Sequence, residues 1–139
     1  MDAFKSNIYQ YLNGTCHYMI PLYQRTYNWE KEQCSRLWDD IVNLHRTNHE
    51  GHFIGSIVRI NEASAAGSTV AMIIDGQQRL TTLTLLLIAL RDYASLHPDC
   101  GVNPSKINDT LLINHYETGN FKYKLLLTQA DRDALIKKI

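Results

Sequence analysis

The stretch Val70-Ala71-Met72-Ile73-Ile74-Asp75-Gly76-Gln77-Gln78-Arg79-Leu80 decides the fold of this chain. Its apolar first half is typical of a buried strand. Gly76 permits a sharp turn, because glycine adopts positive φ without steric cost. The helix that follows begins with backbone N–H groups that have no intrahelical acceptor. Such a helix start, with an arginine nearby, favours an anion such as phosphate. The stretch therefore predicts a strand, a turn and a helix with a phosphate site at its start.

The same residues supply a candidate catalytic set. Asp75 ends the strand, where its carboxylate can hold a divalent cation such as Mg²⁺ or orient a water. Arg79 and the amides from Gly76 onward would stabilise charge on a transferred phosphoryl group. Gln77 and Gln78 can orient a water, or read a base or ribose, through their side-chain amides. We therefore predict that Asp75, Arg79 and Gln78 are catalytic, that Asp75 is the metal ligand, and that Gly76 and Gln77 bind phosphate.

A structural interpretation of these residues stays open beside the functional one. Asp75 can cap the helix while Arg79, four residues on, folds back to pair with it. Gln77 and Gln78 can be ordinary solvated residues of a first helical turn. In that case the segment would hold the fold together without binding a ligand.

A second polar segment is Ile20-Pro21-Leu22-Tyr23-Gln24-Arg25-Thr26-Tyr27-Asn28-Trp29, at the end of a short strand expected over residues 17–22. Gln24 and Arg25 follow a proline-ended strand, so we expect them to bind the same phosphates as Arg79 from another loop. The alternative for Arg25 is surface packing on its aromatic neighbours.

The remaining hydrophobic patterns predict an α+β fold, a small mixed sheet flanked by helices. Helices are expected over residues 3–12, 29–46, 77–96, 105–116 and after Thr128, and strands over 17–22, 52–60, 70–75 and 122–127. The helix from 77 to 96 is apolar on nearly all sides between Leu83 and Leu90, so we expect it in the middle of the structure. The helix from 29 to 46 is expected to bury Cys34, Leu37, Trp38, Ile41 and Val42.

Composition excludes several classes of protein. The 139 residues are enough for one domain, and Lys+Arg and Asp+Glu both number 14, so no overall positive field attracts DNA. Three cysteines without CxxC spacing argue against a disulfide framework or a zinc site. The chain has no signal-peptide pattern and no apolar run long enough to span a bilayer. A cytoplasmic location is therefore expected.

Three histidines, His45, His49 and His52, have the spacing of metal ligands on one helix face. Gly51 interrupts that helix. The favoured interpretation is therefore a loop with solvated histidines.

Three stretches together resemble a known family. They are the segment over residues 20–29, His52-Phe53-Ile54-Gly55-Ser56-Ile57-Val58, and Ile74-Asp75-Gly76-Gln77-Gln78-Arg79-Leu80-Thr81-Thr82-Leu83. They resemble the N-terminal domain of GmrSD-type modification-dependent restriction enzymes, which is marked by a DGQQR motif. Leu37-Trp38-Asp39-Asp40-Ile41 is also similar to a segment of that family. The resemblance covers residues 5–95 best.

The resemblance implies a ParB/sulfiredoxin-like fold, with a nucleotide-binding domain over residues 1–100. Residues 101–139 would begin a mainly helical C-terminal extension that is cut in the middle of an element. It also implies that the domain binds or hydrolyses NTP, with a divalent cation such as Mg²⁺, in bacterial defence against phage DNA with modified bases. The implied partners are DNA, bound through regions outside this chain, and an HNH-type nuclease domain or subunit.

Two other functions stay open. The domain can be a non-catalytic module that recognises DNA or a protein partner. It can also be a nuclease of ParB-like fold, which would need a basic track leading to Asp75, and the neutral charge balance gives that little support. The nucleotide, the DNA modification and the oligomeric state are not specified by the sequence.

Overall fold

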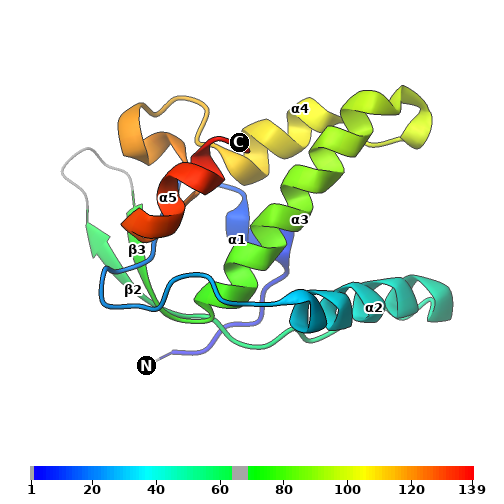
Figure 1. Cartoon of the computed structure of the whole chain (residues 1–139), viewed down its shortest axis with the longest axis horizontal. Coiled ribbons are helices and arrows are strands. Elements are labelled where there is room, and N and C mark those ends of the chain that lie inside the picture. The colour runs from blue at the N-terminus through cyan, green and yellow to red at the C-terminus, as the bar shows by residue number, and fades with distance from the viewer. Residues whose placement is uncertain (1, 64–68) are drawn as a thin grey trace.

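The computed structural model shows a mixed sheet with helices around it (Figure 1). It describes residues 2–63 and 69–139. In chain order the elements are α1 (Ile8–Leu12), β1 (His17–Met19), α2 (Lys31–Thr47), β2 (Val58–Ala63), β3 (Thr69–Asp75), α3 (Gln77–Leu96), the 3₁₀ turn η1 (Pro98–Cys100), α4 (Pro104–Ile107), the π-helical turn η2 (Asn108–Leu112), the 3₁₀ turn η3 (Gly119–Lys122), β4 (Leu125–Leu126) and α5 (Gln129–Ile136).

The turn between β3 and α3 forms as predicted. Gly76 has φ +90°, in the region that favours glycine. A Cβ atom at this position would lie 2.9 Å from the carbonyl oxygen of Ser56, closer than real Cβ contacts. Both the backbone conformation and the close approach of the segment before β2 therefore require glycine here.

The strands form one sheet in the order β2-β3-β1-β4. β2 runs antiparallel to β3, whereas β1 is parallel to both β3 and β4. Tyr18 at the centre of β1 lies opposite Ala71 on one side and Leu125 on the other. The predicted α+β class and the mixed sheet are confirmed.

The hydrophobic core draws on the whole length of the chain. Its fully buried side chains include Leu12, Tyr18, Ile73, Leu80, Leu112 and Leu125. Because β4 pairs with β1 and Leu112 and Leu125 belong to this cluster, the ranges 1–100 and 101–139 share one sheet and one core.

α3 is only partly interior. Its first two turns are buried, but Leu90, Tyr93 and Leu96 near its end are exposed, Leu96 to 79%. In Figure 1 the end of α3 extends away from the sheet. The prediction that this helix lies in the middle of the structure is therefore wrong for its last two turns.

α2 also differs from the prediction. None of its residues is buried, and Trp38 is 55% exposed, so the expected buried face is at best half covered. The helix begins at Lys31, two residues after the expected start at residue 29, with a capping box between Glu30 and Gln33. Just before it, the N–H of Asn28 donates to the Gln78 side chain.

The strand predicted over residues 52–60 begins only at Val58. Residues 51–57 are irregular, and Gly55 within them has φ +114°. The carbonyl of Ser56 accepts a hydrogen bond from Arg79 and so is not part of a strand ladder. A side chain on α3 therefore shapes this segment.

The C-terminal third contains shorter elements than expected. The helix predicted over residues 105–116 ends at Leu112, and the strand predicted over 122–127 is reduced to β4. α5 follows Thr128 as predicted. The carboxylate of Asp131, in the first turn of α5, accepts a hydrogen bond from Tyr27 N–H at 2.7 Å. Among the described residues, no helix has the length and apolar character needed to cross a membrane.

His17 generates a prediction about stability and pH. The ring is 1% exposed, and Nδ1–H donates to the Tyr123 carbonyl at 2.6 Å. Burial lowers the pKa of His17 from its ordinary 6.5, against the opposing effect of this hydrogen bond. The unfolded chain therefore takes up a proton as the pH falls through about 6.5 while the folded chain does not. We expect the free energy of unfolding to decrease below about pH 6.5 for this reason.

The measurement is urea unfolding between pH 5 and 8 for the wild type and for His17→Asn. Asparagine keeps a donor near Tyr123 but does not titrate. The variant should have a lower free energy of unfolding at every pH, and this free energy should depend less on pH than in the wild type. His49→Asn, at an exposed position, is the control. An identical pH dependence in wild type and His17→Asn would contradict the assignment.

Candidate functional site

Gln78 holds the 24–28 segment onto the start of α3. Its Oε1 accepts a hydrogen bond from Asn28 N–H at 2.9 Å, and its Nε2 donates to the Thr26 carbonyl at 3.0 Å. The side chain is 8% exposed. Both polar ends of the amide are therefore engaged with backbone, which favours a positioning role for Gln78.

Gln77 and Gln24 extend this arrangement. Gln77 Nε2 donates to Gln24 Oε1 at 3.2 Å, and Gln24 Nε2 donates to the Ile74 carbonyl at 3.1 Å. Gln77 is 7% exposed, so the alternative of solvated first-turn residues is wrong for both α3 glutamines. The phosphate-binding roles of Gln77 and Gln24 stay predictions, but the observed contacts fix the loop against β3 and α3.

Asp75 lies exposed at the end of β3, where its Oδ1 accepts a hydrogen bond from Gly76 N–H at 2.9 Å. It does not form the ion pair with Arg79 that the structural interpretation required. No three His, Cys, Asp or Glu side chains gather into a metal site within residues 2–63 and 69–139. A cation at Asp75 would therefore take its other ligands from water or from a bound molecule. That fits Mg²⁺, which is usually held by one or two carboxylates together with substrate phosphates.

Arg79 is directed toward the irregular 51–57 segment. Its Nη1 donates to the Ser56 carbonyl at 2.9 Å. Gly55 leaves room for the guanidinium, because a Cβ there would lie 2.6 Å from Arg79 Cζ. Glycine at 55 and at 76 thus lets one segment approach both the turn and the arginine.

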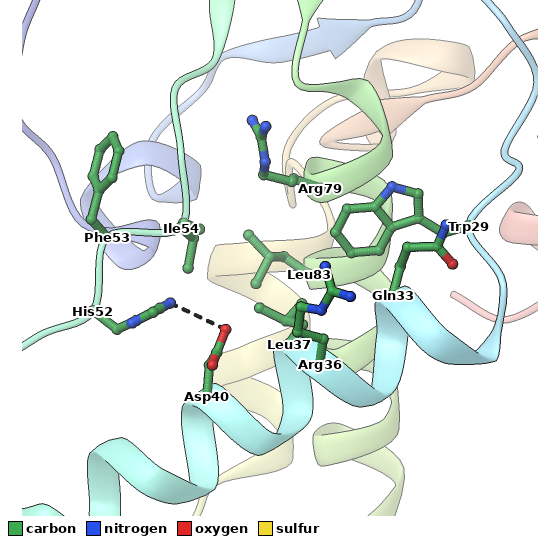
Figure 2. Close-up of a pocket in the computed structure, with 10 residues that line it drawn as sticks. All are labelled: Trp29, Gln33, Arg36, Leu37, Asp40, His52, Phe53, Ile54, Arg79 and Leu83. Carbon is green, nitrogen blue, oxygen red and sulfur yellow. Dashed lines mark ion pairs between the residues drawn. The ribbon is translucent and has the colours of Figure 1, made fainter.

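Arg79 lines a pocket of about 250 Å³ between α2, α3 and the 51–57 segment (Figure 2). Leu37 and Leu83 contribute apolar walls, Arg36 adds a second guanidinium, and Trp29 adds an indole ring. The lining residues are Trp29, Gln33, Arg36, Leu37, Asp40, His52, Phe53, Ile54, Arg79 and Leu83. The pocket thus combines cationic, aromatic and apolar surface, as ligand sites do.

Arg25 lines a different and much smaller pocket. That pocket has a volume of about 10 Å³ and also touches Gln77, Gln78 and Asp131. It has room for about one water molecule, not for a phosphate group. The expectation that Arg25 and Arg79 reach a common cavity is therefore wrong. The open space lies on the Arg79 side.

The α3 amides are less accessible than the sequence suggested. The first intrahelical bond joins Leu80 N–H to the Gly76 carbonyl at 3.0 Å, which leaves the amides of Gln77, Gln78 and Arg79 without that type of partner. However, Gly76, Gln77 and Gln78 are buried. An anion at this helix start would therefore contact the Arg79 side chain first.

Sequence reasoning missed several residues of the larger pocket. Asp40 Oδ2 lies 3.3 Å from His52 Nε2, so His52 is paired and not simply solvated as expected. Arg36, Asp40 and Phe53 were assigned no role. The sequence did offer a signal for three of them. His52 and Phe53 open the family-like stretch over residues 52–58, and Asp40 lies in the family-like stretch over residues 37–41.

Comparison with known proteins supports the motifs. The sequence matches the family described as GmrSD restriction endonuclease, N-terminal domain, over residues 3–139. No curated protein matches the chain. The matched range contains every residue of both pockets.

The Gln78 contacts generate a prediction about the loop. In Gln78→Met, the Asn28 N–H and Thr26 carbonyl lose their partners while the side chain keeps a similar length. We expect a loss of about 1–3 kcal/mol in the free energy of unfolding, as for other unpaired polar groups. Hydrogen exchange at the Asn28 amide should also become faster.

Urea unfolding and amide exchange measure both effects. Gln33→Met is the matched control, because Gln33 accepts one hydrogen bond from Glu30 N–H at an exposed helix start. Unchanged exchange at Asn28 in Gln78→Met would show that the loop does not depend on Gln78.

Proposed function

Because the chain belongs to the N-terminal domain family of GmrSD restriction endonucleases, we propose that it binds and hydrolyses a nucleoside triphosphate. Family membership makes the protein a component of a modification-dependent, type IV restriction system that defends against phage DNA. The observation that carries the proposal is the pocket in which Arg79, from the DGQQR sequence, meets Arg36 and Trp29.

The pocket supplies the contacts that an NTP needs. Arg79 and Arg36 can bind phosphate oxygens through charge-assisted hydrogen bonds, which are about twice as strong as neutral ones. Arg79 would exchange the neutral Ser56 carbonyl for a phosphate oxygen. Leu37, Leu83 and the Trp29 ring offer surface for the apolar parts of a nucleoside. Charge and shape therefore support nucleotide binding at this pocket.

Asp75 is the residue that would hold Mg²⁺. The cation, when bound, neutralises charge on the phosphates and on the transferred group. Asp75 lies at the end of β3, and only Gly76 separates it from the start of α3. Ligands in open α/β sheets favour such strand ends. The extension of that rule to this small mixed sheet is an analogy. Gln78, by its contacts, would position the 24–28 loop.

A nuclease centre within this chain is less well supported. The described residues hold no cluster of three metal-ligating side chains, and the net charge is zero. We therefore assign DNA binding to regions outside this chain and cleavage to an HNH-type nuclease domain or subunit, in the cytoplasm. A non-catalytic recognition domain is the alternative that the following two experiments would reveal.

Arg79→Ala tests nucleotide binding. We expect one or more NTPs to raise the melting temperature of the wild-type chain. At a concentration of about a hundred times Kd, the bound NTP should add about 2.7 kcal/mol to the free energy of unfolding. Arg79→Ala should lose most of this shift, because a cation that contacts phosphate is removed.

The measurement is thermal shift with each NTP, with and without Mg²⁺. Arg46→Ala, an exposed arginine at the end of α2 outside the pocket, is the control. A shift of equal size in Arg79→Ala and wild type would place the nucleotide elsewhere. No shift with any NTP would favour a recognition domain.

Asp75→Ala tests hydrolysis in the intact restriction protein. The lost hydrogen bond to Gly76 N–H should cost only about 0.5–1.5 kcal/mol of stability. Loss of a metal ligand should cost several kcal/mol in the barrier and abolish phosphate release. Phosphate release at the wild-type rate, in a variant that melts near the wild-type temperature, would show that Asp75 only caps the turn.

A further inference from the structure

The larger pocket holds charges of both signs, with Arg79 on α3 and with Arg36 and Asp40 one helical turn apart on α2. Arg79 lies at one side, and Figure 2 shows Leu83 between Arg79 and Asp40. Among the described residues that line the pocket, Asp40 is the one carboxylate. A triphosphate would be attracted to the arginines and repelled by Asp40. We therefore expect the part of a nucleotide that meets Asp40 to be a neutral hydrogen-bond donor.

Asp40 is held in place by its neighbour. Its Oδ2 lies 3.3 Å from His52 Nε2, and the two side chains come from different segments, α2 and the 51–57 segment. A carboxylate has about four acceptor sites, so one contact with His52 leaves others free. The carboxylate is about half exposed, with 43% of its side chain accessible, so a ligand can reach it.

Vicinal hydroxyl groups suit this carboxylate better than a base edge. Each ribose hydroxyl is a donor, and the diol is common to all ribonucleotides, whereas donors on the base edge differ between bases. Carboxylates bind the ribose 2′-hydroxyl in other nucleotide sites for the same reason. Phe53 lines the same pocket, is 83% exposed, and offers a ring surface for the base.

We propose that Asp40 binds the ribose diol of the nucleotide, so that this pocket takes ribonucleoside triphosphates in preference to deoxyribonucleoside triphosphates. This inference rests on the proposed function. It adds the orientation of the ligand, with phosphates at Arg79 and the sugar at Asp40. It also adds a reason for the His52 contact, which makes His52 a positioning residue.

The experiment measures Kd for matched NTP and dNTP pairs, with Mg²⁺, by calorimetry on the wild-type chain. A hydrogen bond to a charged acceptor predicts that each NTP that binds does so about tenfold more tightly than its 2′-deoxy analogue. Asp40→Ala should weaken NTP binding more than dNTP binding, because a dNTP keeps only the 3′-hydroxyl contact, so that the preference disappears. Asp39→Ala, the neighbouring exposed carboxylate outside the pocket, should keep the preference.

The outcomes separate the two proposals. Equal wild-type affinity for NTP and dNTP, or an undiminished preference in Asp40→Ala, overturns the ribose assignment and leaves nucleotide binding intact. Absence of binding by either set overturns both. The 2′-deoxy and 3′-deoxy forms of one nucleotide, tested on the wild type alone, give the same answer without any variant. If removal of neither ribose hydroxyl weakens binding, Asp40 does not contact the sugar.

Discussion

The close approach of the 51–57 segment to the β3–α3 turn is the constraint on which this structure depends. Gly76 lies under the Ser56 carbonyl, with no space for a Cβ, and Gly55 lies under the Arg79 guanidinium in the same way. Arg79 completes the contact by donating to Ser56. These contacts explain why β2 starts late, at Val58, and why an irregular segment forms one wall of the larger pocket.

A second set of contacts fixes the other loop. The glutamines at 77 and 78 tie residues 24–28 to the start of α3, and Asp131 from α5 binds the Tyr27 amide. Amide side chains suit this task because each has both a donor and an acceptor. The paired glutamines thus serve the architecture around the arginine. The charged residues at 75 and 79 remain accessible for ligand chemistry.

The parts of the fold that could be predicted are those determined by local sequence. The buried strand, the glycine turn and the helix over 77–96 follow from residue type and periodicity, and so does the mixed α+β class. The larger pocket could not be predicted, because Arg36, Asp40 and His52 come together only when α2 and the 51–57 segment pack near α3. The separation of Arg25 from Arg79 has the same origin, since it depends on which side of α3 each loop covers. The incomplete burial of α2 could not be foreseen either, because an amphipathic pattern shows that a face is apolar but not what covers it.

We propose that nucleotide binds in the pocket beside Arg79 and not beside Arg25 in the 24–28 segment. The two tryptophans provide a direct test, since Trp29 lines the pocket and Trp38 lies outside it, 55% exposed on α2. The measurement is the ¹⁵N–¹H indole spectrum of the chain during titration with a non-hydrolysable NTP and Mg²⁺. We predict that the Trp29 indole resonance shifts with saturation while the Trp38 resonance stays in place. A shift of Trp38 alone, or a bound nucleotide that moves neither resonance, would contradict the account.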